Sequence, residues 1–121
     1  PELKGKLTGN AIRVPTPNVS LAIINLSLEQ GTDRESLNAY LQQMALSSAL
    51  HRQIDYSAST ELVSSDMVGS RFAGIVDSQA TIAEGDHCVL YVWYDNEFGY
   101  SCQVVRVMEQ MAGVVRQDLP A

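Results

Sequence analysis

The sequence contains few of the residues on which several classes of protein depend. Only two cysteines occur among the 121 residues, Cys88 and Cys102, and they show no CxxC spacing, so neither a disulfide framework nor a zinc site is indicated. Eight basic residues stand against fourteen acidic ones, which gives a net charge of −6. This balance argues against non-specific binding to nucleic acid, which needs a basic surface. Reduced thiols in a cytoplasmic protein are the simplest interpretation.

Long apolar runs are also missing. No stretch approaches the roughly 20 residues that a helix needs to span a bilayer, and no signal-peptide pattern opens the chain. We therefore expect a cytoplasmic protein without membrane contact. The sequence also has no Ser-His-Asp arrangement, no glycine-rich phosphate loop and no Rossmann fingerprint. Taken alone, the residues reveal no catalytic centre.

The chain does contain enough apolar residues, 45% of the total, for one domain with a buried core. Val19–Leu28 is rich in branched residues and apolar on both faces, which predicts a strand buried on both sides. Further strands are predicted for Leu7–Pro15, within 51–70, for Arg71–Asp77, and on both sides of a short turn within 81–95.

Two helices are predicted between and after these strands. Thr32 with Glu35 three residues later forms the pattern of a capping box and predicts a helix over 33–50. Apolar residues at helical spacing predict a second helix over 101–113. Consecutive strands with short turns, interrupted by helices, predict an α+β fold with a mixed, mostly antiparallel sheet that is covered on one face by helix.

The trio Asp86-His87-Cys88 offers the residue types of a base and a nucleophile. Adjacent side chains of a strand point to opposite faces, however, so His87 and Cys88 cannot meet. We interpret the trio as a polar cluster at the start of a strand. His51 follows the first helix, and we expect it to interact with the helix dipole at that end.

Three residues are candidates for ligand binding, each with a plain structural alternative. Arg13 lies between apolar neighbours and suits phosphate recognition, or it is a solvent-facing arginine paired with an acidic residue. Asn96 offers a donor and an acceptor and can pair with another amide, or it is a turn asparagine. Tyr100 is either a stacking surface or a half-buried helix residue. The stretch that holds the last two, YVWYDNEFGYSCQVV, is either an acidic turn that caps a helix or the wall of a binding site.

Three separate motifs carry a family resemblance: LTGNAIRVPTPNVS, VSSDMVGS and YVWYDNEFGYSCQVV. In this order they resemble the C-terminal part of phosphorylating glyceraldehyde-3-phosphate dehydrogenase, over almost the whole chain. The resemblance implies a glycolytic, cytoplasmic, tetrameric oxidoreductase that converts glyceraldehyde 3-phosphate, NAD and inorganic phosphate to 1,3-bisphosphoglycerate. It also implies a partial catalytic domain over 1–99, followed by a C-terminal helix and tail over 100–121.

The resemblance assigns a role to each candidate. Arg13, in AIRVPT, matches the arginine that holds substrate phosphate or inorganic phosphate. Asn96 matches the asparagine that hydrogen-bonds the nicotinamide carboxamide, and Tyr100 matches the tyrosine beside the nicotinamide ring. We further expect the carboxylates of Asp95 and Glu97 to favour the oxidised, cationic ring.

Parts of the family pattern are not in this sequence. The Ser-Cys-Thr-Thr-Asn nucleophile segment, the general-base histidine, the Thr-Gly phosphate loop and the glycine-rich cofactor loop are missing, so no catalytic residue is assigned and the chain alone should be inactive. Asn10 and Ile12 replace the methionine and phenylalanine of the commonest LTGMAFRVP form. In the family the last helix packs on the Rossmann domain. Here we expect it to expose an apolar stripe and to self-associate or bind a partner surface.

Two alternatives to this function remain open. The chain could be a non-catalytic interaction or oligomerisation module, or part of the related erythrose-4-phosphate dehydrogenase. The choice between NAD and NADP is open as well, because the residues that read the ribose belong to the absent domain.

Overall fold

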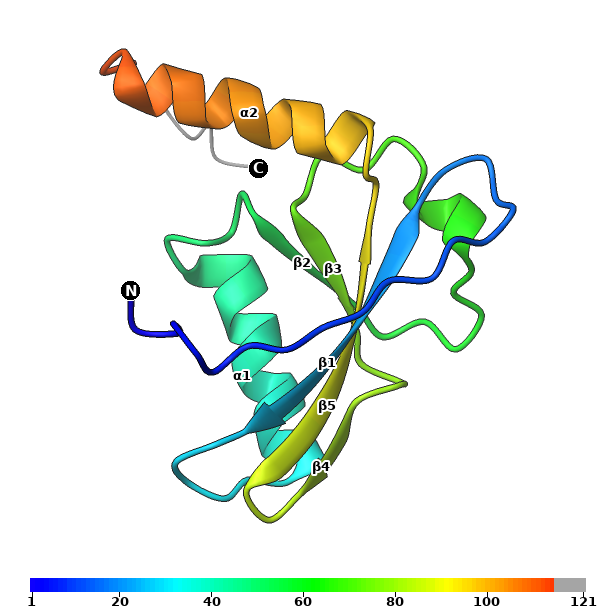
Figure 1. Ribbon diagram of the computed structural model, residues 1–121, viewed down its shortest axis with the longest axis vertical. Helices are drawn as coiled ribbons and strands as arrows, with labels where there is room; N and C mark the ends of the chain where they lie inside the picture. Colours follow the sequence, from blue (N-terminus) through cyan, green and yellow to red (C-terminus); the bar gives the residue numbers. More distant parts are fainter. Residues whose placement is uncertain (115–121) are drawn as a thin grey trace.

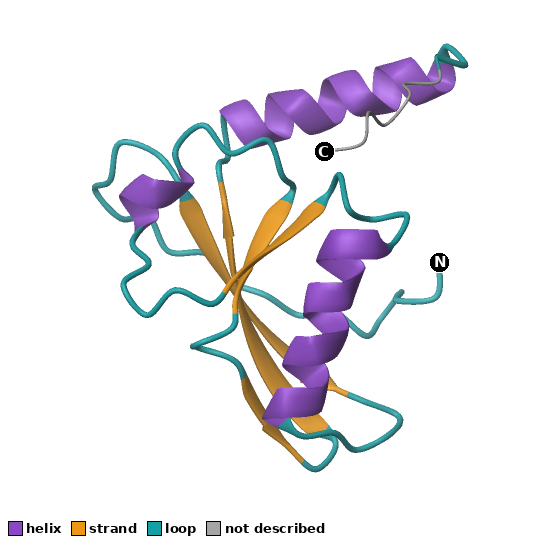
Figure 2. Ribbon diagram, turned by 180° about the vertical axis from the view of Figure 1, so that it is seen from behind, coloured by secondary structure: helices purple, strands orange, loops and turns teal. Residues whose placement is uncertain are grey.

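The computed structural model describes residues 1–114, so residues 115–121 of the predicted tail lie outside the described range. A sheet of five strands carries two helices and a short 3-10 helix (Figures 1 and 2). In chain order the elements are β1 (Ser20–Ser27), α1 (Arg34–Ser47), β2 (Ile54–Ser57), η1 (Ser64–Met67), β3 (Gly74–Asp77), β4 (Ile82–Glu84), β5 (His87–Tyr94) and α2 (Phe98–Met111).

The strand order of the sheet is β1-β5-β3-β2, and β4 pairs with β5 beside this path. β1 runs antiparallel to β5, with Ser20 opposite Tyr94 and Ser27 opposite His87. The β2–β3 pair is parallel, whereas β3 and β4 are antiparallel to β5. α1 lies over one face of the sheet and contacts β2 and β4 (Figure 2). The predicted α+β fold with a mixed, mostly antiparallel sheet is therefore confirmed.

The hydrophobic core lies where the start of β1, η1 and β3 meet. Val19, Met67 and Ile75 are buried there. The side chains that pack against them are Leu62, Phe72 and Trp93. Burial of this cluster ties the segment before β1 to the segment before α2, and so fixes the end of the sheet from which α2 departs.

The predicted strand over Leu7–Pro15 is wrong. The segment has no regular secondary structure and its side chains are exposed. Pro15 and Pro17 supply no backbone N–H to a ladder. The branched residues of the segment favour a strand. Among the described residues, however, no strand lies beside it to pair with.

The strand predicted over Val19–Leu28 is present as β1, but the prediction that it is buried on both sides is wrong. Leu21, Ile23, Ile24 and Leu26 of β1 are between 37% and 55% exposed. β1 is the edge of the sheet, paired only with β5 among the described residues. An apolar edge strand is unusual on a free surface, and it indicates a face that another part of a protein covers.

The N-cap of the first helix lies one residue later than predicted. Asp33, not Thr32, is the N-cap: its carboxylate accepts from the backbone N–H of Ser36 at 2.9 Å and from the Ser36 hydroxyl at 2.8 Å. The backbone hydrogen bond from Ser36, with the hydroxyl bond, holds the pKa of Asp33 below its usual value. Beyond the helix, the His51 ring lies 2.8 Å from the carbonyl oxygen of Ser48, at the helix end where it was expected.

The trio Asp86-His87-Cys88 at the start of β5 is arranged as predicted. Cys88 is only 2% exposed, whereas its neighbour His87 is exposed and contacts Asp86. The histidine and the thiol thus face opposite sides of β5, and they form no base–nucleophile pair.

The last helix begins at Phe98, three residues before the predicted start. Its apolar residues Val104, Val105, Val107, Met108 and Met111 are between 40% and 83% exposed, so the predicted apolar stripe is confirmed. α2 is fastened to the domain mainly near its start, where Gln103 Nε2 donates to the Arg71 carbonyl oxygen at 2.9 Å, and the helix then runs out beyond the sheet (Figure 1). Within residues 1–114 no helix has the length and apolarity to cross a membrane.

Candidate functional site

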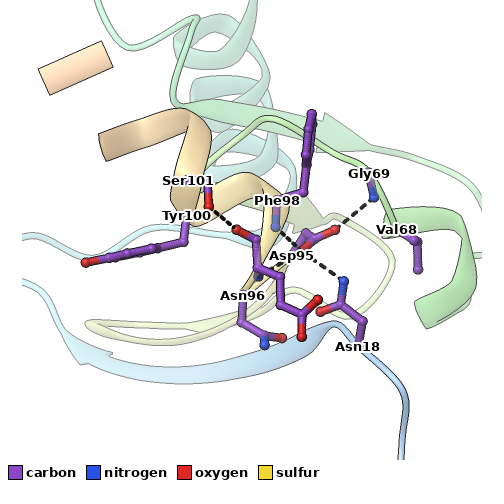
Figure 3. A pocket seen from close by; sticks show the side chains of 9 residues that line it. Asn18, Val68, Gly69, Asp95, Asn96, Phe98, Tyr100 and Ser101 are labelled. Carbon is purple, nitrogen blue, oxygen red and sulfur yellow. Dashed lines mark hydrogen bonds between the residues drawn. The ribbon is translucent and has the colours of Figure 1, made fainter. Parts of the chain in front are cut away.

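A shallow, solvent-open hollow of about 560 Å³ lies at the junction of β5 and α2 (Figure 3). Its lining residues come from four segments: the segment before β1, the loop after η1, the β5–α2 turn and the first turn of α2. They are Asn18, Val68, Gly69, Asp95, Asn96, Glu97, Phe98, Tyr100 and Ser101. The structure thus brings Asn96 and Tyr100 to one place, whereas Arg13 is not among the lining residues.

Asp95 is the centre of this junction. It is 2% exposed, and its two carboxylate oxygens accept four hydrogen bonds. Oδ2 accepts from the backbone N–H of Gly69 at 2.8 Å. Oδ1 accepts from Asn18 Nδ2 at 3.0 Å and from the backbone N–H groups of Glu97 and Phe98 at 2.9 and 2.8 Å. One buried carboxylate therefore joins three chain segments at the floor of the hollow.

These bonds also decide the charge of Asp95. The backbone N–H of Gly69 contributes most, followed by Asn18 and the first N–H groups of α2, and together they outweigh burial and hold the pKa well below its usual value. The carboxylate is thus charged and bound by protein donors beneath the hollow that it lines, and the expectation that Asp95 favours a cationic ligand ring stays a prediction. Glu97 lines the hollow and is exposed, so the same expectation for Glu97 stays a prediction.

The segment that supplies Asn18 is held in a strained conformation. Asn18 Oδ1 accepts from the backbone N–H of Val19 at 2.7 Å, while its Nδ2 donates to Asp95. Val19 has φ +74°, a left-handed conformation that a β-branched residue rarely adopts. Such strain costs on the order of 1–3 kcal/mol and persists only where the surroundings enforce it. Burial of Val19 in the core and the bond to Asn18 enforce it here.

Gly99 explains how α2 approaches the loop after η1. A Cβ at this position would lie 2.9 Å from the carbonyl oxygens of both Ser70 and Phe72. Both are backbone atoms, so they cannot move aside as a flexible side chain would. The glycine therefore permits the close contact that sets the direction of α2 and, with it, the place of Tyr100.

Asn96 and Tyr100 present different groups to the hollow. The Oδ1 atom of Asn96 accepts a hydrogen bond from the Ser20 hydroxyl at 3.1 Å. Tyr100 is 68% exposed, and its ring extends away from Asp95 on the first turn of α2 (Figure 3). An amide beside an exposed aromatic ring suits a flat heteroaromatic ligand that carries its own amide or carbonyl group.

The other sequence candidates lie outside this hollow. Arg13 is exposed on the irregular segment before β1. Across the described part of the chain, no group of three or more His, Cys, Asp or Glu side chains could hold a metal ion. Arg13 is therefore a separate cation on the segment that leads into the hollow.

The comparisons with known proteins identify the family. The model of the glyceraldehyde 3-phosphate dehydrogenase C-terminal domain matches residues 1–96. The chain belongs to the glyceraldehyde-3-phosphate dehydrogenase family. It is 70% identical over 114 residues to a glyceraldehyde-3-phosphate dehydrogenase-like protein of Pseudomonas aeruginosa (strain UCBPP-PA14), covering 94% of this chain and 25% of the relative. It is 43% identical to the glyceraldehyde-3-phosphate dehydrogenase of Echinococcus multilocularis, covering 92% and 33%, and 45% identical to that of Schistosoma mansoni, covering 92% and 32%.

The chain thus spans a quarter to a third of the length of these relatives. The family match covers residues 1–96. The α+β architecture of the structure agrees with it. The resemblance in the three motifs is confirmed at the level of the family. The individual residue roles that it implied remain predictions.

The sequence analysis missed the residues that support this hollow from within the protein. It gave no role to Asn18, Ser20 and Gly99, and it did not identify Asp95 as the residue that joins three chain segments. A local signal existed for Asp95, because an aspartate just before a helix start is a common cap. The partners Asn18 and Gly69 lie far away in sequence, and no local pattern indicates them.

Proposed function

We propose that this chain forms the C-terminal part of an NAD-dependent oxidoreductase that converts glyceraldehyde 3-phosphate and inorganic phosphate to 1,3-bisphosphoglycerate. The observation that carries the proposal is the common hollow of Asn96 and Tyr100 at the β5–α2 junction, in a chain of this family. In this function Asn96 binds the nicotinamide carboxamide, Tyr100 lies beside the nicotinamide ring, and Arg13 binds the phosphate of the substrate or inorganic phosphate.

The residues of the hollow fit the nicotinamide end of the cofactor. NAD, when bound, supplies the acceptor for the hydride that leaves the substrate. The chain's own contribution is to hold and orient the ring: the amide of Asn96 offers a hydrogen bond of fixed direction, and the Tyr100 ring offers an apolar surface. The hollow is open, so the rest of the dinucleotide needs contacts from outside this chain.

The chemistry of bond formation also needs groups from outside the chain. Cys88 is buried, and burial raises the pKa of its thiol, which disfavours the nucleophilic thiolate. Cys102 lies on α2, and its neighbours Ser101 and Gln103 do not form the Ser-Cys-Thr-Thr-Asn segment of the nucleophile. We therefore propose that the nucleophile, the general base and the cofactor loop come from the part of the protein that its relatives have and this chain lacks, in a cytoplasmic homotetramer. The exposed stripe of α2 would pack against that part.

Arg13 gives a direct test of the phosphate role. In the complete gene product, Arg13→Ala is expected to raise the KM for inorganic phosphate and glyceraldehyde 3-phosphate roughly tenfold to hundredfold, because a charge-assisted hydrogen bond is lost. Stability should change by less than about 0.5 kcal/mol, since the side chain is exposed. Lys6→Ala removes an exposed cation from the same segment and is the control. An Arg13→Ala enzyme with both KM values unchanged would remove Arg13 from the site.

A non-catalytic interaction module is the second candidate. The exposed apolar residues of β1 and α2 favour it, because both surfaces suit a protein partner. NADH formation by the complete gene product separates the possibilities. The dehydrogenase requires aldehyde and phosphate together, and a preference for erythrose 4-phosphate would indicate the related enzyme. Absence of reduction with either sugar phosphate, and with either NAD or NADP, would favour the module.

A further inference from the structure

The asparagine that precedes β1 is hydrogen-bonded at both ends of its side chain. Asn18 Nδ2 donates to Asp95 Oδ1 at 3.0 Å, and Asn18 Oδ1 accepts from the backbone N–H of Val19 at 2.7 Å. Neither partner can exchange its role, because a backbone N–H only donates and the Asp95 carboxylate, whose pKa is lowered, is ionised and only accepts. The direction of the amide is therefore fixed, and Asn18 joins the start of β1 to the carboxylate at the floor of the hollow.

The segment before Asn18 carries Arg13 and is stiff. We call residues 13–17 the Arg13 arm. Pro15 and Pro17 fix their own φ angles, and each of them also restricts the backbone of the residue before it. A displacement at the Asn18 end of such an arm is therefore passed on to Arg13 instead of being absorbed along the way.

The Arg13 arm is held at the Asn18 end. Its side chains are exposed, and its one hydrogen bond is local, from the backbone N–H of Thr16 to the Val14 carbonyl oxygen at 2.9 Å. Within residues 1–114 no hydrogen bond joins the arm to another segment. Val19, which follows Asn18, is buried in the core with φ +74°. The direction in which the arm leaves the domain is therefore set at Asn18 and Val19.

Asp95 holds the other side of the site as well. Its Oδ1 also accepts from the backbone N–H groups of Glu97 and Phe98, at 2.9 and 2.8 Å. One carboxylate is thus the anchor of the turn that carries Asn96 and of the arm that carries Arg13. Their relative placement matters for a reaction between two bound molecules, because an error of about 1 Å in position can cost about a hundredfold in rate.

From this arrangement we infer that Asn18 is a positioning residue, which sets the place of the Arg13 guanidinium relative to the hollow through its bond to Asp95. Arg13 lies five residues before Asn18, a separation that spans at most about 18 Å. The inference rests on the proposed function for the phosphate ligand of Arg13. It gives Asn18 a part in phosphate binding that acts only through Arg13.

A double-mutant cycle on the complete gene product tests this dependence. Asn18→Ala is expected to raise the KM for inorganic phosphate and for glyceraldehyde 3-phosphate roughly tenfold, because the arm loses its anchor. In a protein that already carries Arg13→Ala, the same change should raise both values less than about twofold, since no cation is left to place. A merely structural loss would raise them by the same factor in both backgrounds.

Two further variants make the test decisive. Asn18→Ser keeps one polar atom, a bond closer to the backbone, which can accept from the Val19 N–H but does not span the distance to Asp95. It should therefore fold even where alanine does not, and show the same dependence on Arg13. Asn25→Ala removes an exposed asparagine of β1 and should leave both KM values within about twofold of the wild type.

The outcomes separate the inference from the proposed function. A rise in KM in the Asn18 variants that requires Arg13 supports Asn18 as the positioning residue. No rise, or an equal rise with and without Arg13, overturns the inference and leaves the proposed function intact. If Arg13→Ala alone leaves both KM values unchanged, the phosphate role of Arg13 fails, and the inference fails with it.

Discussion

Asp95→Asn is expected to lower the unfolding midpoint of the complete gene product by roughly 10 °C, a large loss for a single isosteric substitution. Asparagine retains an oxygen for Asn18 and the N–H groups of α2. It places an NH₂ group where Oδ2 now accepts from the backbone N–H of Gly69 at 2.8 Å, so two donors face each other in a buried place. Calorimetry measures the effect. Glu97→Gln, the same chemical change on an exposed neighbour, is the control and should shift the midpoint by about 2 °C at most.

The pH dependence of stability gives the same substitution a second readout. The pKa of Asp95 is lower in the folded protein than its ordinary value of 3.8. A lowered folded pKa means that the carboxylate contributes stability that is fully present above the unfolded pKa, and that is lost as pH falls toward the folded pKa. As the pH falls below 5, the free energy of unfolding of the wild type should therefore decrease more than that of Asp95→Asn. Parallel curves for the two proteins would show that the Asp95 charge does not stabilise the fold.

Asn96→Ala is expected to have the largest effect on activity among residues of the hollow. Loss of the amide leaves the nicotinamide ring free to turn, so hydride transfer in the complete gene product should slow roughly tenfold to hundredfold. Binding of the adenosine part should hardly change, because that part lies beyond the residues that line the hollow. Single-turnover NADH formation measures the first effect, and the dissociation constant of ADP-ribose measures the second.

A matched control separates the amide from the loss of any surface asparagine. Asn25→Ala alters an exposed asparagine on β1 that does not line the hollow, and it should leave both quantities unchanged. If Asn96→Ala weakens ADP-ribose binding as much as it slows hydride transfer, the residue supports the site as a whole, and its assignment to the nicotinamide fails.

The sequence predicted the order of elements well, because each element has a local signal. β5 and α2 follow from apolar periodicity, and the α+β architecture follows from short turns between strands. The Leu7–Pro15 segment misled for a physical reason: branched residues favour a strand, but a strand also needs a neighbour, and the prolines remove N–H donors from its end. Local composition contains no information about that neighbour.

Burial was the harder property to predict. The apolar pattern of β1 predicts cover on both faces, and Leu21 and Ile23 nevertheless lie 37% and 55% exposed. The same holds for Met108 and Met111 of α2, at 62% and 83%. The pattern in these elements is typical of surfaces that are buried in a larger protein. It agrees with a chain that spans a quarter to a third of the length of its relatives.

The candidate site shows a similar division between local and distant information. Asn96 and Tyr100 were found through a motif, and they lie in one hollow. The two interpretations of YVWYDNEFGYSCQVV are compatible in the structure, since Asp95 accepts from the first N–H groups of α2 while Asn96 and Tyr100 line the hollow. The bond from Asn18 to Asp95 joins residues 77 positions apart. A single sequence gives no sign of such a pairing.

The most direct test of the central claim is a crystal structure of the complete gene product with NAD bound. We expect the nicotinamide ring to lie in the hollow at the β5–α2 junction, with the side-chain amide of Asn96 within hydrogen-bond distance of the nicotinamide carboxamide and Tyr100 beside the ring. A nicotinamide bound elsewhere, with the amide of Asn96 facing only water, would contradict the account.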